Sequence, residues 1–152
     1  MSIPGEPPLW ECPVCGRAFA NRNQSHSCAA LGRIDDHFLR SSAEVRACFD
    51  AVLAAVEELG PVRVLAEKTR IAFQVRMSFA AFMPRKDWLD GHLVLDRPIA
   101  HARFRTVQTF SPRNVLHTFR LLAPEEVDTE FRSWLAEAYR VGEQRHRDRP
   151  LR

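Results

Sequence analysis

Hydrophobic positions along this chain repeat with two different periods. Helical spacing marks two segments, 42–59 and the stretch that begins at Pro124, and predicts an amphipathic helix in each. The first stripe comprises Val45, Cys48, Phe49, Val52, Leu53, Val56 and Leu59. The second comprises Val127, Phe131, Trp134, Leu135, Ala138 and Val141. Ser41 and Glu44 fit a capping box before the first helix, and Gly60 with Pro61 ends it.

Between the two helices the hydrophobic period is two, which predicts strands. Every odd position from 71 to 83 is apolar, whereas the even positions include Gln74, Arg76 and Ser78. This run is too long for one ordinary strand, so we expect a turn near 76–78 to divide it. Further strands are expected at 62–64, 93–96, 105–110 and 115–122, with turns at 84–87 and 111–114. The pattern predicts an α+β domain: an antiparallel sheet of five to six strands flanked by an N-terminal and a C-terminal helix.

Composition divides the chain into four segments. Residues 1–9 contain three prolines and a glycine and are expected to be a flexible leader. Residues 10–40 form a small module rich in Cys and His, residues 41–144 form the α+β domain, and residues 145–152 form a charged tail.

The overall composition is that of a soluble globular protein, with 152 residues of which 45% are hydrophobic and 27% charged. A net charge of +3 does not by itself indicate nucleic-acid binding. The chain contains neither a signal-peptide pattern nor an apolar run of about 18 residues, so we expect a cytoplasmic protein without membrane contact. Its oligomeric state is left open.

The cysteines carry the clearest chemical signal. Cys12 and Cys15 enclose two residues and precede Gly16, which is the pattern of a metal-binding knuckle, and Cys28 supplies a third thiolate. His26 lies two residues before Cys28 and is the expected fourth ligand. A complete set of four nitrogen and sulfur ligands predicts a tetrahedral, structural Zn²⁺. Trp10 and Phe19 are then the expected miniature core of the module.

Alternatives to this ligand set remain open. His37 or Cys48 could replace His26, although Cys48 lies on the apolar stripe of the first helix and His37 suits a cap or packing role. A thioredoxin-like redox pair is the main rival reading of Cys12 and Cys15, but it needs a preceding strand and a following helix.

Specific residues also resemble a known family. The runs WECPVCGRAFANRNQSHSC and EKTRIAFQVRMSFAAFMPRKDWLDGHLVL are similar to a bacterial family of uncharacterised proteins. Its C-terminal part is a domain of unknown function, labelled in places as a predicted transport-protein domain, and its knuckle is found in some members. The resemblance spans residues 10–144, implies an α+β fold and brings no catalytic residue with it. The matching positions are Glu67, Lys68, Ile71, Ala72, Phe73, Phe79, Pro84, Lys86, Leu93, Leu95, Ala138 and Tyr139.

The main domain offers weaker candidates for a site. His117 shares the apolar phase of Val115 and Phe119, which favours a buried core histidine over a catalyst. A rival interpretation groups Lys68, Arg70, His117 and Arg120 as a pocket for an anion or nucleotide on the sheet. The sequence has no phosphate-binding glycine loop and no catalytic motif of the nucleophile-elbow or zinc-protease type, so a non-enzymatic role is favoured.

Two functional hypotheses follow. The first is a zinc-stabilised binding module that contacts nucleic acid or a protein partner, using the loop of Arg17, Arg22, Asn23 and Gln24. A basic face could add to it, formed by the Arg-rich tail together with Arg76, Arg85, Lys86, Arg103 and Arg105. The second is a small ligand-binding or enzymatic domain built around the pocket of His117, Lys68 and Arg70. The module itself is close to neutral in formal charge, which is unlike a strongly basic DNA-reading finger.

Overall fold

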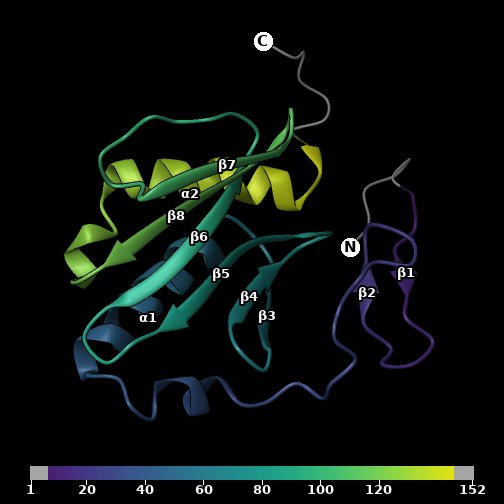
Figure 1. Cartoon of the computed structure of the whole chain (residues 1–152), viewed down its shortest axis with the longest axis horizontal. Coiled ribbons are helices and arrows are strands. Elements are labelled where there is room, and N and C mark those ends of the chain that lie inside the picture. The colour runs from purple at the N-terminus through teal and green to yellow at the C-terminus, as the bar shows by residue number, and fades with distance from the viewer. Residues whose placement is uncertain (1–6, 146–152) are drawn as a thin grey trace.

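A six-stranded antiparallel sheet forms the body of the molecule in the computed structural model, which describes residues 7–145. The strand order is β3-β4-β5-β6-β8-β7. The strands are β3 (Arg63–Ala66), β4 (Ile71–Gln74), β5 (Ser78–Pro84), β6 (Leu89–Leu95), β7 (Thr106–Ser111) and β8 (Asn114–Leu121). The loop 96–105 carries the chain past β8 to the edge, and the β7–β8 hairpin then returns beside β6 (Figure 1). The predicted α+β class is confirmed.

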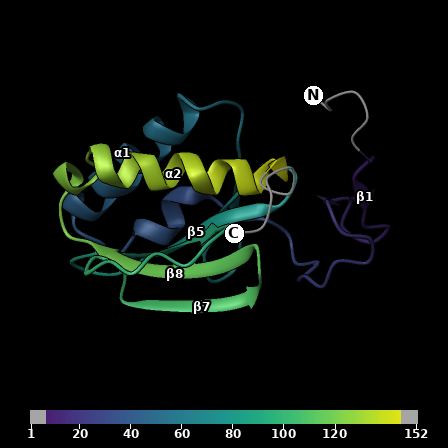
Figure 2. The same ribbon diagram turned by 90° about the horizontal axis from the view of Figure 1, so that it is seen from above.

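Both α-helices cover the same face of this sheet. Figure 2 shows α1 (Ala43–Glu57) and α2 (Thr129–Gly142) on one side of the sheet, and residues 7–145 place no helix on the opposite side. Alternation along β8 follows from this arrangement, because Val115, His117, Phe119 and Leu121 are buried while the residues between them are partly exposed. A two-layer domain with one open sheet face results.

The core between the helices and the sheet is strongly aromatic. Phe49 of α1 packs edge-on against Phe82, with ring centroids 5.9 Å apart, and Phe119 meets Phe131 of α2 at 5.0 Å. Phe79 of β5, which follows a register shift between β4 and β5, meets Tyr139 of α2 at a centroid distance of 5.6 Å. Burial of these rings accounts for much of the stability of the domain.

Most predicted elements are confirmed, and a few boundaries are corrected. The expected break in the 71–83 run is present between β4 and β5. The capping box of Ser41 and Glu44 is wrong: Ser42 is the N-cap and makes no side-chain cap bond, while Ser41 Oγ donates to the carbonyl oxygen of Arg85. Leu59 lies beyond α1 and is exposed instead of buried.

The last helix begins later than the sequence pattern predicts. Pro124–Glu126 form a short 3-10 turn, η2, and α2 starts at Thr129. Asp128 is its N-cap, with its side chain accepting from the backbone N–H of Phe131. Within residues 7–145 no helix is both long and apolar enough to cross a membrane. The expected leader and tail fall largely on residues 1–6 and 146–152, which lie outside the described part.

Candidate metal centre and the adjoining cleft

The N-terminal module folds around a very short hairpin. Strands β1 (Trp10–Glu11) and β2 (Ala18–Phe19) pair antiparallel, with Trp10 opposite Phe19. The knuckle between them is closed by two backbone hydrogen bonds, Cys12 N–H to the oxygen of Arg17 and Gly16 N–H to the oxygen of Cys12, both 2.8 Å. Gly16 has a φ of 76°, a left-handed conformation that favours glycine. The knuckle thus turns Cys12 and Cys15 toward one point.

Four ligand atoms converge at that point. The Sγ atoms of Cys12 and Cys28 are 3.7 Å apart, and His26 Nε2 lies 3.3 Å from Cys15 Sγ and 3.4 Å from Cys28 Sγ. All four atoms lie within 4.8 Å of one another, close enough to hold a metal ion. A disulfide would need sulfurs about 2.05 Å apart, and the four cysteines of the chain are free thiols.

The imidazole of His26 is oriented by a backbone contact. Its Nδ1 donates to the carbonyl oxygen of Gln24 at 2.6 Å, which leaves the Nε2 lone pair facing the sulfurs. Metal-binding histidines commonly have such an outer hydrogen bond, because it fixes the ring and its tautomer. The backbone N–H of Cys15 lowers the pKa of the Cys12 thiol to about 6 against the opposing effect of desolvation, whereas the side-chain hydrogen bond with Cys12 raises the pKa of the Cys28 thiol to about 11. Of these two thiols, Cys12 therefore favours the thiolate form that a metal requires.

Little besides this cluster holds the module together. Between residues 7 and 33 the buried residues are Cys12 and Phe19. The Phe19 ring contacts the imidazole of His26, with centroids 4.4 Å apart, and Trp10 at 6.1 Å. Trp10 and Phe19 therefore form the predicted miniature core, and this core packs directly on a ligand of the cluster.

Polar contacts attach the module to the sheet. Gln74 of β4 donates through Nε2 to the carbonyl oxygen of Ala18 at 2.8 Å. Arg17 pairs with Glu67 at 2.8 Å, and the other carboxylate oxygen of Glu67 accepts from Arg70 Nε at 2.8 Å. Both arginines lower the pKa of Glu67 and outweigh the desolvation that opposes them. Glu67 thereby links the knuckle to the loop between β3 and β4.

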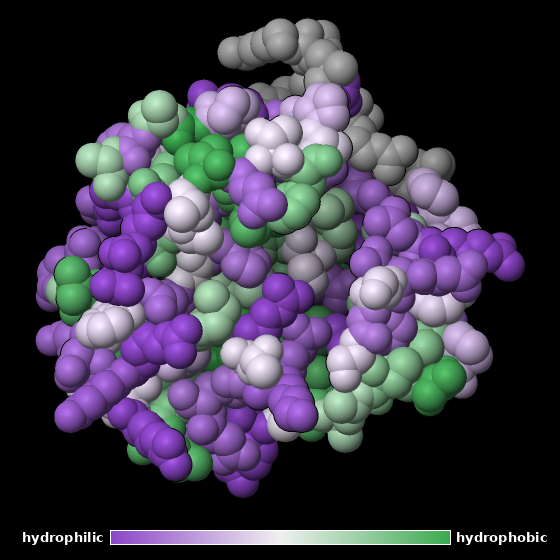
Figure 3. Space-filling model, viewed as in Figure 1, coloured by the Kyte–Doolittle hydropathy of each residue, from purple (hydrophilic) through white to green (hydrophobic). Residues whose placement is uncertain are grey.

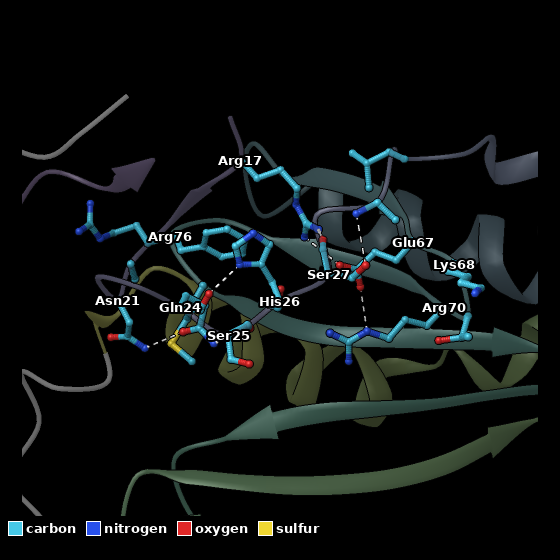
Figure 4. A pocket seen from close by; sticks show the side chains of 17 residues that line it. Arg17, Asn21, Gln24, Ser25, His26, Ser27, Glu67, Lys68, Arg70 and Arg76 are labelled. Carbon is cyan, nitrogen blue, oxygen red and sulfur yellow. Dashed lines mark hydrogen bonds and ion pairs between the residues drawn. The ribbon is translucent and has the colours of Figure 1, made fainter. Parts of the chain in front are cut away.

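A cleft of about 380 Å³ separates the module from this end of the sheet. The module supplies one wall, and the β3–β4 loop and the start of β5 supply the other (Figures 3 and 4). Its cationic lining residues are Arg17, Lys68, Arg70 and Arg76. Figure 4 shows the Arg76 guanidinium directed away from the other labelled residues, and it bonds to Gln144 and to the carbonyl oxygen of Pro7.

The two alternative ligands lie outside the cluster. His37 donates through Nε2 to the carbonyl oxygen of Glu67 at 2.8 Å and so connects the short 3-10 helix η1 (Ile34–Phe38) to the end of β3. Cys48 is completely buried in α1, as the stripe predicts, and burial raises the pKa of its thiol to about 11. The loose connection after β2 also lacks the helix that a thioredoxin-like pair requires, since the next described helix is η1.

The four residues grouped as a sheet pocket do not come together. Lys68 and Arg70 line the cleft, whereas His117 is fully buried under the helices and Arg120 pairs with Asp90 at 3.2 Å. Both ring nitrogens of His117 are bonded in the interior, Nε2 accepting from Ile99 N–H and Nδ1 donating to the oxygen of Val115. It acts as a core residue that fastens the 96–105 loop to β8.

The expected basic face on the sheet is largely neutralised. Arg85 pairs with Asp90 at 3.0 Å and Arg103 with Asp128 at 3.0 Å, while Arg76 is buried. The charged groups that gather are instead those of the cleft, which sequence reasoning missed as a unit. Its walls lie about 50 positions apart in the chain, and no local pattern reports such a contact.

Fold and cluster together define a class: an α+β domain that carries an N-terminal Cys₃His group able to hold a metal. Residues 34–142 match the family described as "Domain of unknown function (DUF5655)", and the chain belongs to that family. The match begins after the four clustered residues, so the metal-type module lies outside it. Neither the curated proteins nor the solved structures contain a match to this chain.

Proposed function

We propose that this protein is a zinc-stabilised, non-enzymatic binding module that contacts a nucleic acid or a protein partner. The observation that carries the proposal is the spacing of the ligand atoms. Zinc–sulfur bonds of about 2.3 Å in a regular tetrahedron place sulfurs roughly 3.8 Å apart, and a zinc–nitrogen bond places nitrogen about 3.6 Å from sulfur. The distances from Cys12 to Cys28 and from His26 to Cys15 and Cys28, 3.3–3.7 Å, fit such an ion.

A structural role for the ion follows from the ligand count. Cys12, Cys15, His26 and Cys28 fill a tetrahedron, so no position stays open for a substrate or a reactive water. The adjacent cleft supports binding in preference to catalysis. Its histidine, His26, has both ring nitrogens engaged, and its carboxylate, Glu67, is held by two arginines with a lowered pKa. Neither group is suited to take a proton from a substrate.

Between the two kinds of partner the cleft favours nucleic acid. Arg17 and Gln24, two of the four loop residues expected to contact it, line the cleft, and Arg22 and Asn23 are exposed beside it. Phosphate groups are the feature common to all nucleic acids and are bound by arginine and lysine.

Metal content and a polarisation titration test the proposal together. The natively purified chain is expected to contain one zinc per molecule and to bind single-stranded RNA or DNA with an affinity that falls as salt rises. Absence of stoichiometric zinc would refute the metal assignment. Stoichiometric zinc without binding at or below about 100 mM salt would exclude the nucleic-acid form and leave a protein partner.

A further inference from the structure

The strongest unassigned feature is the chemistry of the cleft beside the metal cluster. Three cations with access to it, Arg17, Lys68 and Arg70, stand against one carboxylate, Glu67, and leave an excess of positive charge. Glu67 occupies only part of their donor capacity. Arg70 uses its Nε for this contact, and Lys68 is exposed and makes no ion pair or hydrogen bond with another described residue. Arg17 donates through Nη2 to Glu67 and through Nη1 to the carbonyl oxygen of Ser27 at 3.4 Å, and its Nε is buried without a partner among the described residues.

Neutral donors surround these cations from several directions. Ser25 and Ser27 project from the module, Thr69 from the loop between β3 and β4, and Ser78 from the start of β5. A planar carboxylate offers two oxygens in one plane, whereas a phosphate offers three in a tetrahedral arrangement. Donors that approach from three elements therefore suit a phosphate better. Figure 4 shows Arg70 extending toward Ser25 and Ser27, across the space where such an anion would lie.

The cleft is also larger than a phosphate group. A volume of about 380 Å³ is within the range of small-ligand sites and leaves room for a further, less polar part of the ligand. Apolar lining is present for that part: Phe19, Leu31 and Met77. A second, adjoining hollow of about 320 Å³ shares Ala29, Glu67 and Lys68 with the first, so Lys68 stands at the border of the two.

We propose that this cleft binds a phosphate group carried by a nucleotide-sized ligand, with Lys68, Arg70 and Arg17 as its cationic contacts. The inference rests on the proposed function, since the zinc module supplies one wall. Two sources share this chemistry. A free mononucleotide would fill the cleft alone, whereas a single-stranded nucleic acid would extend its next nucleotide past Lys68 into the adjoining hollow.

Titration of the full-length, zinc-loaded protein distinguishes these sources. The probes are a nucleoside 5′-monophosphate, the same nucleoside without phosphate, a single-stranded oligonucleotide and a poly-glutamate peptide. Binding of the monophosphate but not of the nucleoside indicates the small-molecule source. Binding of the oligonucleotide alone indicates the polymer. Poly-glutamate bound as tightly as either phosphate probe would overturn the assignment to phosphate.

Two lysine variants assign the contact to the cleft. Lys68→Ala is expected to weaken binding roughly tenfold, the scale of one charge-assisted hydrogen bond, and to reduce the salt slope for the oligonucleotide by about 0.7. Lys86→Ala is the matched control, because Lys86 is the other lysine of the chain and does not line the cleft. It should bind as the unchanged protein does.

Arg70→Gln gives an independent test, read together with thermal unfolding. It should weaken binding at least as much as Lys68→Ala, and a loss of affinity without a matching loss of stability excludes simple unfolding. Equal binding by the Lys68 and Lys86 variants, or no binding of any phosphate probe, overturns the phosphate site. If the same preparation contains one zinc per chain, the proposal of a zinc-stabilised module stands even though the phosphate site is refuted, so the two proposals fail separately.

Discussion

Removal of the metal ligand set should unfold the N-terminal module and leave the α+β domain folded. Cys15→Ser is the sharpest perturbation, because Cys15 is only partly buried and its hydroxyl replacement is a poor zinc ligand. The apolar contribution of the module is small. Complete burial of Phe19 is worth about 2–3 kcal/mol, and Trp10 is only half-buried.

The contacts to the sheet cannot replace the ion. The Gln74 to Ala18 hydrogen bond and the partly exposed Arg17–Glu67 pair are worth on the order of 1 kcal/mol each. A structural zinc contributes about 10–16 kcal/mol in small metal-dependent folds. A zinc ion bound by the four residues would therefore outweigh each of these contacts.

Hydrogen exchange followed by mass spectrometry measures this directly. In Cys15→Ser, or in the unchanged protein after treatment with a strong chelator, peptides covering 10–28 should lose protection by at least about a thousandfold, equivalent to roughly 4 kcal/mol of local stability. Peptides from β5, β6 and β8 should keep their protection. Protection of 10–28 that persists without metal would refute the reasoning.

Cys48→Ala serves as the matched control for the loss of a cysteine. Cys48 is buried in the core of the domain, away from the cluster. This variant should retain one zinc and a protected module, while the stability of the domain falls by about 1 kcal/mol through the small cavity. Loss of zinc in Cys48→Ala would place the ion elsewhere.

Three further predictions concern the α+β domain. Gly142→Ala should lower the melting temperature by several degrees, because its Cβ would lie 2.5 Å from Phe79 Cδ1 and overpacking costs about 1–3 kcal/mol. Gly32→Ala is the control and should leave the melting temperature unchanged, because its Cβ would lie 3.8 Å from its nearest neighbour. His92 should titrate by NMR near pH 4, since burial lowers its pKa to about 4. As the pH falls, the unfolded chain protonates His92 before the folded protein does, so the free energy of unfolding should fall by on the order of 1–3 kcal/mol between pH 6.5 and 4. His92→Gln should reduce that fall. Asp128→Ala should lower the free energy of unfolding in urea by about 1 kcal/mol at pH 7, because the N-cap is lost. The backbone N–H that Asp128 binds lowers the pKa of its carboxyl. Once the pH is low enough to protonate this carboxyl, the unchanged protein loses the same contact, so the difference in stability between the two proteins should shrink.

Periodic burial explains why the fold could largely be predicted. The stripe of α1 reports directly which side chains enter the core. The alternation in 71–83 predicts strands but not the whole core, because all of β4 and residues 79–82 of β5 are buried and Phe82, an even position, packs against Phe49. The start of β6 was missed because Gly91 interrupts the apolar pattern of the strand. A side chain at Gly91 would lie 2.8 Å from Phe119 and 2.9 Å from Phe82, so two large rings fill the place that an apolar residue would otherwise mark.

Other features depend on contacts that no pattern encodes. The start of α2 is decided by polar side chains, since Glu126 accepts from the backbone N–H groups of Leu122 and Ala123 and so holds the 3-10 turn apart from the helix. The spacing of Cys12, Cys15, His26 and Cys28 could be interpreted locally because a metal site in a short segment has few possible geometries. The cleft could not, because it exists only after the module docks on the sheet.

That docking connects the Cys₃His cluster to the cleft through a short chain of contacts. Arg17 follows the knuckle in sequence and binds Glu67, which in turn binds Arg70 on the opposite wall. Loss of the ion would release Arg17 and the serine wall together, although Lys68 and Arg70 would keep their positions on the folded sheet. A phosphate site formed by the sheet alone would survive chelation with most of its charge intact. A site formed between the two parts, as the lining residues indicate, must lose affinity when the metal is removed.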